Sequence, residues 1–238
     1  SSGMTIMHYL ASMKGGDKLL SSEILSSIPV TERDSSGRTP LAIAVHSGLT
    51  ANAGYFLGRG GDASGEDWNG VKLVLVGYDK GKAMLNLLLD KGADPESTAP
   101  NGINLIHMSI EKKDLETLKL LIQKGAGINK QYKNGSFPLL HAIYKGNPAV
   151  IQFLIQSGAD TNVKDGNGTT PIMAAVESKD VKTADYLVRG GADVNVMNST
   201  GKYLILVAYE TNRIDIFNKM ITGGAKINQL YSGNALLH

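Results

Sequence analysis

The sequence predicts an all-α fold: a solenoid of stacked helix-turn-helix repeats joined by β-turn or hairpin-like loops. Two markers that recur with nearly the same period support this prediction. One is a turn glycine that returns every 32–34 residues, at Gly3, Gly37, Gly70, Gly102, Gly135, Gly168, Gly201 and Gly233. The other is a glycine placed to end a helix, which returns every 32–33 residues, at Gly60, Gly92, Gly125, Gly158, Gly191 and Gly224. Because two independent markers keep one period, we predict a repeat array.

The stretch from Asp165 to Ala175 shows how one repeat is built. Gly168 can adopt a positive φ in a tight turn, and Thr170 can cap the following helix by accepting a backbone N–H bond. Pro171 suits the first helical position, where its missing N–H is not needed. One repeat therefore reads as a turn, a short helix, a second helix, a glycine stop and an extended return.

The chain is predicted to be a single array that covers residues 1–238. Its repeats span approximately 1–33, 34–66, 67–98, 99–131, 132–164, 165–197 and 198–229, followed by a partial repeat at 230–238. The chain opens on a repeat turn and stops where an eighth repeat begins. Since neither end has the polar cap that solenoids need, we expect the natural protein to continue past residue 238.

Apolar residues at helical spacing place two helices in each repeat. The first helices are expected at 5–11, 39–44, 73–76, 104–107, 138–141, 171–175 and 204–209. The second helices are expected at 19–28, 49–58, 82–91, 115–124, 148–156, 183–189 and 214–222. Gly54 and Gly58 each cost about 1 kcal/mol relative to Ala inside a helix, so the second helix of the second repeat is predicted to be the weakest.

The repeat resembles that of the ankyrin family, whose signature is Thr-Pro-Leu-His-x-Ala over a period of 33 residues. Residues 39–44 read Thr-Pro-Leu-Ala-Ile-Ala, and both 158–162 and 191–195 match the closing Gly-Ala-Asp-x-Asn. Lys72-Leu73 and Tyr203-Leu204 replace Thr-Pro, which should weaken local capping. The resemblance implies a concave face of turn tips and inner helices, and a convex back formed by the second helices.

Composition excludes several classes of function. The net charge is only +2, so a nucleic-acid partner is not expected. There is no cysteine, and therefore neither a disulfide framework nor a thiolate metal site. No apolar run approaches the roughly 18 residues that span a bilayer, so membrane insertion is not expected. The absence of cysteine fits the cytoplasm, or the host cytoplasm if the chain is a secreted effector.

No catalytic, metal-binding or cofactor-binding residues are predicted. Each of the five histidines, His8, His46, His107, His141 and His238, is expected to bond turn backbone within its own repeat. Their spacing shows no converging metal ligands. The glycine clusters do not match phosphate-binding loops, and no nucleophile elbow is present. We therefore expect a chain that is not an enzyme, has no cofactor and takes no small-molecule substrate.

Bulky side chains at positions that the repeat leaves free are the candidates for partner binding, because Trp, Tyr and Arg most often carry interface energy. They are Arg38, His46, Trp68, Glu111, Tyr132, Lys133, Tyr144, Lys145, Lys202 and Tyr231. The sequence thus predicts a non-enzymatic scaffold that binds a partner protein or peptide through its concave face. The alternative is a targeting or regulatory segment of a larger enzyme, such as a secreted bacterial effector or signalling protein, with its catalytic domain outside these residues.

Overall fold

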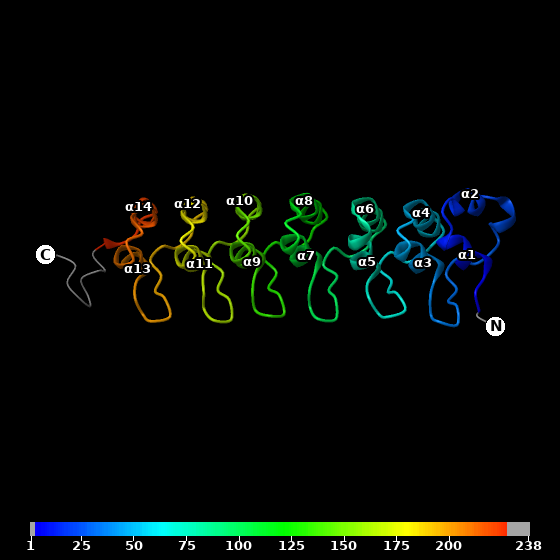
Figure 1. Cartoon of the computed structure of the whole chain (residues 1–238), viewed down its shortest axis with the longest axis horizontal. Coiled ribbons are helices and arrows are strands. Elements are labelled where there is room, and N and C mark those ends of the chain that lie inside the picture. Colours follow the sequence, from blue (N-terminus) through cyan, green and yellow to red (C-terminus); the bar gives the residue numbers. More distant parts are fainter. Residues whose placement is uncertain (1–2, 228–238) are drawn as a thin grey trace. The chain divides into compact units, whose positions relative to one another are not determined.

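The computed structural model describes residues 3–227 of the chain (Figure 1). Within this range the chain forms fourteen α-helices and no strand, with only isolated bridges such as that between Glu66 and Lys72. The inner helices are α1 (Ile6–Ser12), α3 (Pro40–His46), α5 (Leu73–Lys80), α7 (Leu105–Glu111), α9 (Pro138–Tyr144), α11 (Pro171–Glu177) and α13 (Leu204–Glu210). The outer helices are α2 (Gly16–Leu20), α4 (Thr50–Gly58), α6 (Lys82–Asp90), α8 (Leu115–Gln123), α10 (Pro148–Gln156), α12 (Val181–Arg189) and α14 (Ile214–Thr222). This alternation confirms the predicted all-α helix-pair architecture.

The described residues group into two compact units, one formed by residues 3–105 with 120–126 and the other by residues 106–119 with 127–227. In the first unit, α3 packs against α1, α4 and α5, and α6 packs against both α4 and α5. In the second unit, α11 packs against α9, α12 and α13, and α12 packs against α10 and α14. Within each of these two sets, therefore, helices of successive pairs pack against one another, as repeat architectures require.

The Thr-Pro dipeptides start helices as predicted. Thr39 precedes Pro40, and its side-chain oxygen accepts a hydrogen bond of 3.2 Å from the backbone N–H of Ala42. The side-chain oxygen of Thr170 likewise caps α11, because it accepts a hydrogen bond of 3.4 Å from the backbone N–H of Met173. Tyr203, which replaces the threonine before α13, makes no side-chain cap bond. Lys72, which replaces the threonine before α5, makes none either.

A third periodic turn, between the inner and outer helix of a repeat, was not predicted. Its residue has a positive φ and is glycine in four repeats, as at Gly146 (φ 61°). In three others it is Lys113 (φ 55°), Lys179 (φ 60°) or Asn212 (φ 54°). Left-handed backbone is unfavourable for residues that carry a Cβ, so these three positions hold strain.

The outer helix of the first repeat differs from the prediction. Instead of one helix over residues 19–28, α2 ends at Leu20 and a 3₁₀ turn, η1 (Glu23–Leu25), follows it. Two local features account for the break. Ser26 Oγ donates to the carbonyl of Glu23, which competes with helical bonding. The guanidinium of Arg59, the residue that follows α4, donates to three carbonyls of this segment, those of Leu25, Ser26 and Ile28, and so satisfies acceptors that the helix leaves open.

No helix among residues 3–227 combines the length and the apolar character needed to cross a lipid bilayer.

Candidate binding surface and histidine cluster

The last residue of each inner helix occupies an equivalent position in the repeat. From the second repeat onwards this position includes His46, Glu111, Tyr144, Glu177 and Glu210, all polar or aromatic. The four in the second unit are exposed. Because these side chains are exposed, packing does not dictate them, and they can vary from repeat to repeat.

Three side chains of the second unit lie close together, and one of them is Glu111, the last residue of α7. His107 and Glu111 lie one turn apart on α7, and His141 lies on α9. Glu111 Oε1 is 3.6 Å from His107 Nε2 and 3.0 Å from His141 Nε2. The two imidazole ring centroids are 4.2 Å apart. Lys145, just after α9, places its Nζ 2.8 Å from the same Oε1 atom.

The aromatic ring of Tyr132 packs against both histidines of this cluster. Its ring centroid lies 4.9 Å from that of His107 and 6.0 Å from that of His141. The residue is only 6% exposed. The side chain of Tyr132 thus packs against both imidazoles, although its backbone lies on the turn.

Burial sets the charge state of the two histidines. Desolvation lowers the pKa of His107, and it lowers the pKa of His141 to about 4, with the neighbouring His107 as the next cause. A hydrogen bond from Lys145 lowers the pKa of Glu111. At neutral pH the site therefore holds two neutral imidazoles, an ionised carboxylate and an ammonium group.

The prediction that each histidine bonds only turn backbone of its own repeat is wrong. His8 Nδ1 does contact Thr5 of its own repeat, but His8 Nε2 lies 3.0 Å from the carbonyl oxygen of Arg38 in the next one. His46 Nε2 pairs with the Asp67 carboxylate at 2.8 Å. The prediction that no two histidines lie close together is also wrong for His107 and His141. Their separation of 34 residues is about one period, which places them side by side on successive repeats.

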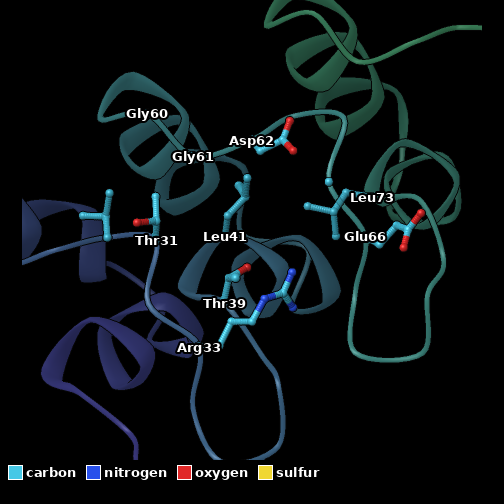
Figure 2. A pocket seen from close by; sticks show the side chains of 11 residues that line it. Thr31, Arg33, Thr39, Leu41, Gly60, Gly61, Asp62, Glu66 and Leu73 are labelled. Atoms are coloured by element: carbon cyan, nitrogen blue, oxygen red, sulfur yellow. The ribbon is translucent and has the colours of Figure 1, made fainter.

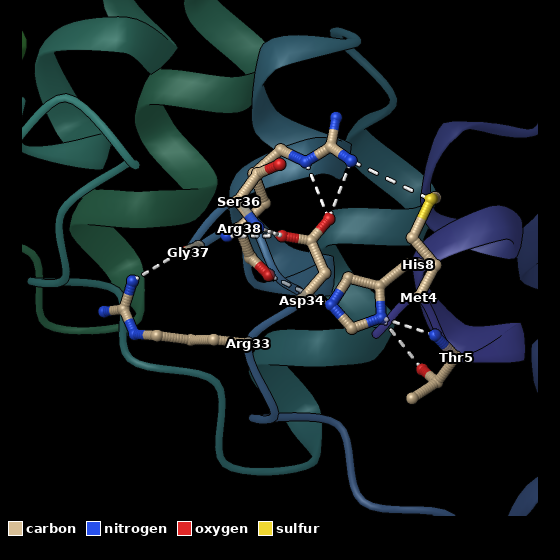
Figure 3. A network of polar contacts seen from close by, with 8 residues as sticks. All are labelled: Met4, Thr5, His8, Arg33, Asp34, Ser36, Gly37 and Arg38. Carbon is tan, nitrogen blue, oxygen red and sulfur yellow. Dashed lines mark hydrogen bonds and ion pairs between the residues drawn. The ribbon is translucent and has the colours of Figure 1, made fainter. Parts of the chain in front are cut away.

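Arg38, a predicted contact residue, is held in a network near the start of the chain (Figure 3). Its Nε and Nη2 atoms both lie 2.7 Å from Oδ2 of Asp34. The other carboxylate oxygen of Asp34 accepts the backbone N–H bonds of Ser36 and Arg38. The network fixes the turn between the first two repeats, and it leaves about a third of the Arg38 side chain exposed.

The structure brings His46 and Trp68 together in the first unit. Their ring centroids are 4.2 Å apart, and Trp68 is 38% exposed. His46 Nε2 also contacts the carboxylate of Asp67, which precedes Trp68 on the turn tip. The indole therefore rests on a histidine that is itself oriented by a buried carboxylate.

The remaining candidates occupy different environments. Tyr144 is 56% exposed, and its hydroxyl makes one long contact of 3.4 Å with Asp165. Lys133 is exposed on a turn. Lys202 forms an ion pair of 2.8 Å with Glu210. Tyr231 lies outside the described residues.

A pocket in the first unit does not suit a small-molecule ligand. It lies between the returns that follow the first two repeats, where Thr31, Thr39, Leu41 and Leu73 face it (Figure 2). Its volume is about 160 Å³. Ligand pockets usually measure about 300–1,000 Å³.

Comparison with known proteins agrees with this architecture. The sequence matches the family profile described as ankyrin repeats (3 copies), over residues 73–165 and 157–231. Among well-characterised proteins, no sequence matches this chain significantly.

Three solved ankyrin repeat structures are similar in fold. The ankyrin repeat domain of Bcl-3, a member of the IkappaB protein family, has a TM-score of 0.74 at 24% identity, covering 92% of this chain and 100% of that one. The domain of human ASB11 has a TM-score of 0.62 at 20% identity, with coverage of 94% and 99%. A domain from Acinetobacter baumannii AYE has a TM-score of 0.54 at 21% identity, with coverage of 92% and 98%.

Proposed function

This chain belongs to the ankyrin repeat family, and on that premise we propose that it is a non-enzymatic scaffold that binds another protein or a peptide segment. The binding surface is the face formed by turn tips and inner helices. That face carries the side chains that differ from repeat to repeat, whereas the positions that build the helix pairs are filled by small and apolar residues.

The observation that carries this proposal is the exposure of Tyr144. An aromatic side chain that is 56% exposed at the end of an inner helix leaves most of its apolar surface in water. Tyrosine combines a large apolar area with a polar hydroxyl and loses little conformational entropy on binding, which is why it is frequent at interface hot spots. Its hydroxyl makes a long contact of 3.4 Å with Asp165 on an exposed side chain, so it can also bond a partner.

The charges around Tyr144 indicate what kind of segment fits. Lys145 and Glu111 form an ion pair beside it, and Asp165 lies on its other side. Because both signs of charge are present, the surface suits a polar segment that places an apolar side chain against the ring. Lys133 on the neighbouring turn favours an acidic group in that segment.

Quantitative capture of partners tests the proposal. Immobilised wild-type chain, Tyr144→Ala and Lys119→Ala would be compared by mass spectrometry of the proteins that they retain from a cell extract. Lys119 is the matched control, since it lies on the outer helix α8 and pairs only with Glu116, at 2.9 Å. Truncation of an interface anchor costs about 1–4 kcal/mol, so Tyr144→Ala should lose at least about tenfold of one specific partner.

Lys119→Ala should retain that partner, because an exposed ion pair contributes only about 0–1 kcal/mol. The proposal fails if every retained protein binds Tyr144→Ala as well as wild type, or if Lys119→Ala alone loses the partner. The melting curves of all three proteins should coincide, which separates a lost contact from a lost fold.

A further inference from the structure

We propose that His107, Glu111 and His141 form a binding site for a divalent transition-metal ion of the Zn²⁺ type. The three side chains come from two successive inner helices, and one potential ligand atom of each lies within 4.8 Å of the other two. This site does not require that the chain bind a partner, although it shares Glu111 with the proposed binding surface.

The three potential ligand atoms are of the types that Zn²⁺ prefers. Two imidazole nitrogens and one carboxylate oxygen are the protein ligands of many zinc sites that keep a fourth position for water. Ligands at about 2.0–2.1 Å from tetrahedral zinc lie about 3.3 Å from one another. The contacts of Glu111 Oε1 with the two Nε2 atoms, 3.0 and 3.6 Å, bracket that separation. Hard ions such as Mg²⁺ and Ca²⁺ prefer all-oxygen sites and fit this set poorly.

A second observation points to a ligand at the same place. His141 is 9% exposed, and its buried Nε2 atom makes no hydrogen bond. The atom lies close to Glu111 Oε1, but the contact does not have hydrogen-bond geometry. Leaving a buried polar atom without a hydrogen-bond partner is energetically unfavourable. A metal ion between the two side chains would satisfy the nitrogen lone pair.

The surroundings of the two histidines also hold their rings in place. Tyr132 packs against the two rings and limits their rotation. Fixed orientation of ligating histidines is a common source of metal affinity.

The positive charge of Lys145 disfavours the binding of a cation at this site. Its ammonium group lies 2.8 Å from the carboxylate oxygen that would ligate the metal, and it must move away when the ion binds. The lysine side chain is 41% exposed and can turn into solvent. Removing its charge should therefore strengthen metal binding, which is the opposite of the effect of removing a ligand.

Titration of the full chain, free of any affinity tag and stripped with a chelator, tests the site. The probe is Co²⁺, whose visible spectrum reports tetrahedral coordination, with Zn²⁺ competition and elemental analysis for stoichiometry. We expect one equivalent of metal in wild type. His107→Ala, His141→Ala and Glu111→Gln should each weaken binding at least about tenfold. Lys145→Gln should tighten it by about two- to fivefold.

His46→Ala is the matched control, because its imidazole faces a single carboxylate, that of Asp67, and should leave metal affinity unchanged. Glu111→Gln is the decisive variant, since this partly exposed side chain is not part of the core. The proposal is overturned if wild type takes up no stoichiometric metal, or if Glu111→Gln binds Co²⁺ as tightly as wild type with the same spectrum.

Discussion

Asn52 on α4 reaches into the first repeat, where its side-chain nitrogen lies 2.9 Å from the carbonyl oxygen of Leu10 at the end of α1. The same nitrogen is 3.1 Å from the carbonyl of Ala11 and 3.0 Å from that of Met13. Its side-chain oxygen accepts the backbone N–H of Asp17, at 3.1 Å. One buried amide therefore satisfies both the end of α1 and the start of α2.

Replacing Asn52 by Ala should destabilise the first unit. The substitution leaves several buried backbone groups without a partner, and such a loss costs about 1–3 kcal/mol. Chemical denaturation followed by circular dichroism measures it. Asn86→Ala is the control, because Asn86 is exposed and bonds only Asp90; it should change the free energy of unfolding by less than about 0.5 kcal/mol. Equal losses in the two variants would contradict the assigned role of Asn52.

Most of the fold could be predicted from the sequence because its signals are local. Glycines at a fixed period and Thr-Pro at helix starts act through backbone geometry, and Thr39 and Thr170 cap their helices as expected. The break after α2 was missed because it depends on Arg59, which comes from the next repeat. Capping by a distant side chain leaves no signature in the segment that it ends.

The candidate site could be predicted only in part. Tyr144 was singled out as a bulky residue at a free position, and it is exposed, but its role in partner binding stays a prediction. Tyr132 was singled out by the same reasoning but turns inward onto His107 and His141. The signal that could have found this cluster is the separation of the two histidines by about one period. Residues one period apart are neighbours in a stack even when they are remote in sequence.

Relief of backbone strain gives a second prediction. Lys179 has φ 60° in the turn before α12, a conformation that glycine adopts without a steric penalty. Lys179→Gly should therefore stabilise the second unit by about 0.5–1 kcal/mol. Lys182→Gly, on the exposed side of α12, is the control and should cost about 1 kcal/mol. Thermal melts that show both changes lowering stability would refute the strain argument.

Acid sensitivity of the first unit follows from Asp34. A hydrogen bond from the Arg38 side chain, opposed by desolvation and aided by two backbone N–H groups, holds the pKa of Asp34 below its usual value. A carboxylate whose pKa is lower in the folded state contributes stability above its unfolded pKa, about 3.9, and loses it as the pH falls through the folded value. Asp34→Asn should thus be less stable than wild type at pH 7.

That difference between Asp34→Asn and wild type should shrink as the pH falls below about 4. Urea denaturation at several pH values measures it. Arg38→Gln tests the cause, because it removes the largest contribution and should bring the acid loss to a higher pH. A difference between the two proteins that stays constant from pH 7 to pH 3 would show that the carboxylate charge does not stabilise the turn.

Local opening should be most frequent in α4. This helix contains Gly54 in its interior and ends on Gly58, whereas α12 contains no glycine and its first turn is capped by Asp180. Glycine costs about 1 kcal/mol relative to Ala in a helix, and repeat arrays open locally because each repeat is supported only by its neighbours. Backbone amides of residues 50–58 should therefore exchange with deuterium faster than those of residues 181–189.

The variant Gly54→Ala tests directly whether glycine sets the local stability of α4. A methyl group at this position would lie 3.8 Å from Cδ2 of Leu87 on α6, an ordinary van der Waals contact, so the substitution fits without rearrangement. It should slow exchange throughout α4 by about fivefold, the rate change that corresponds to 1 kcal/mol. Exchange in α12 should stay the same, since that helix lies in the other compact unit. If exchange in α4 of wild type is already as slow as in α12, glycine does not set the local stability, and the contacts of α4 with α3 and α6 outweigh its weak helix propensity.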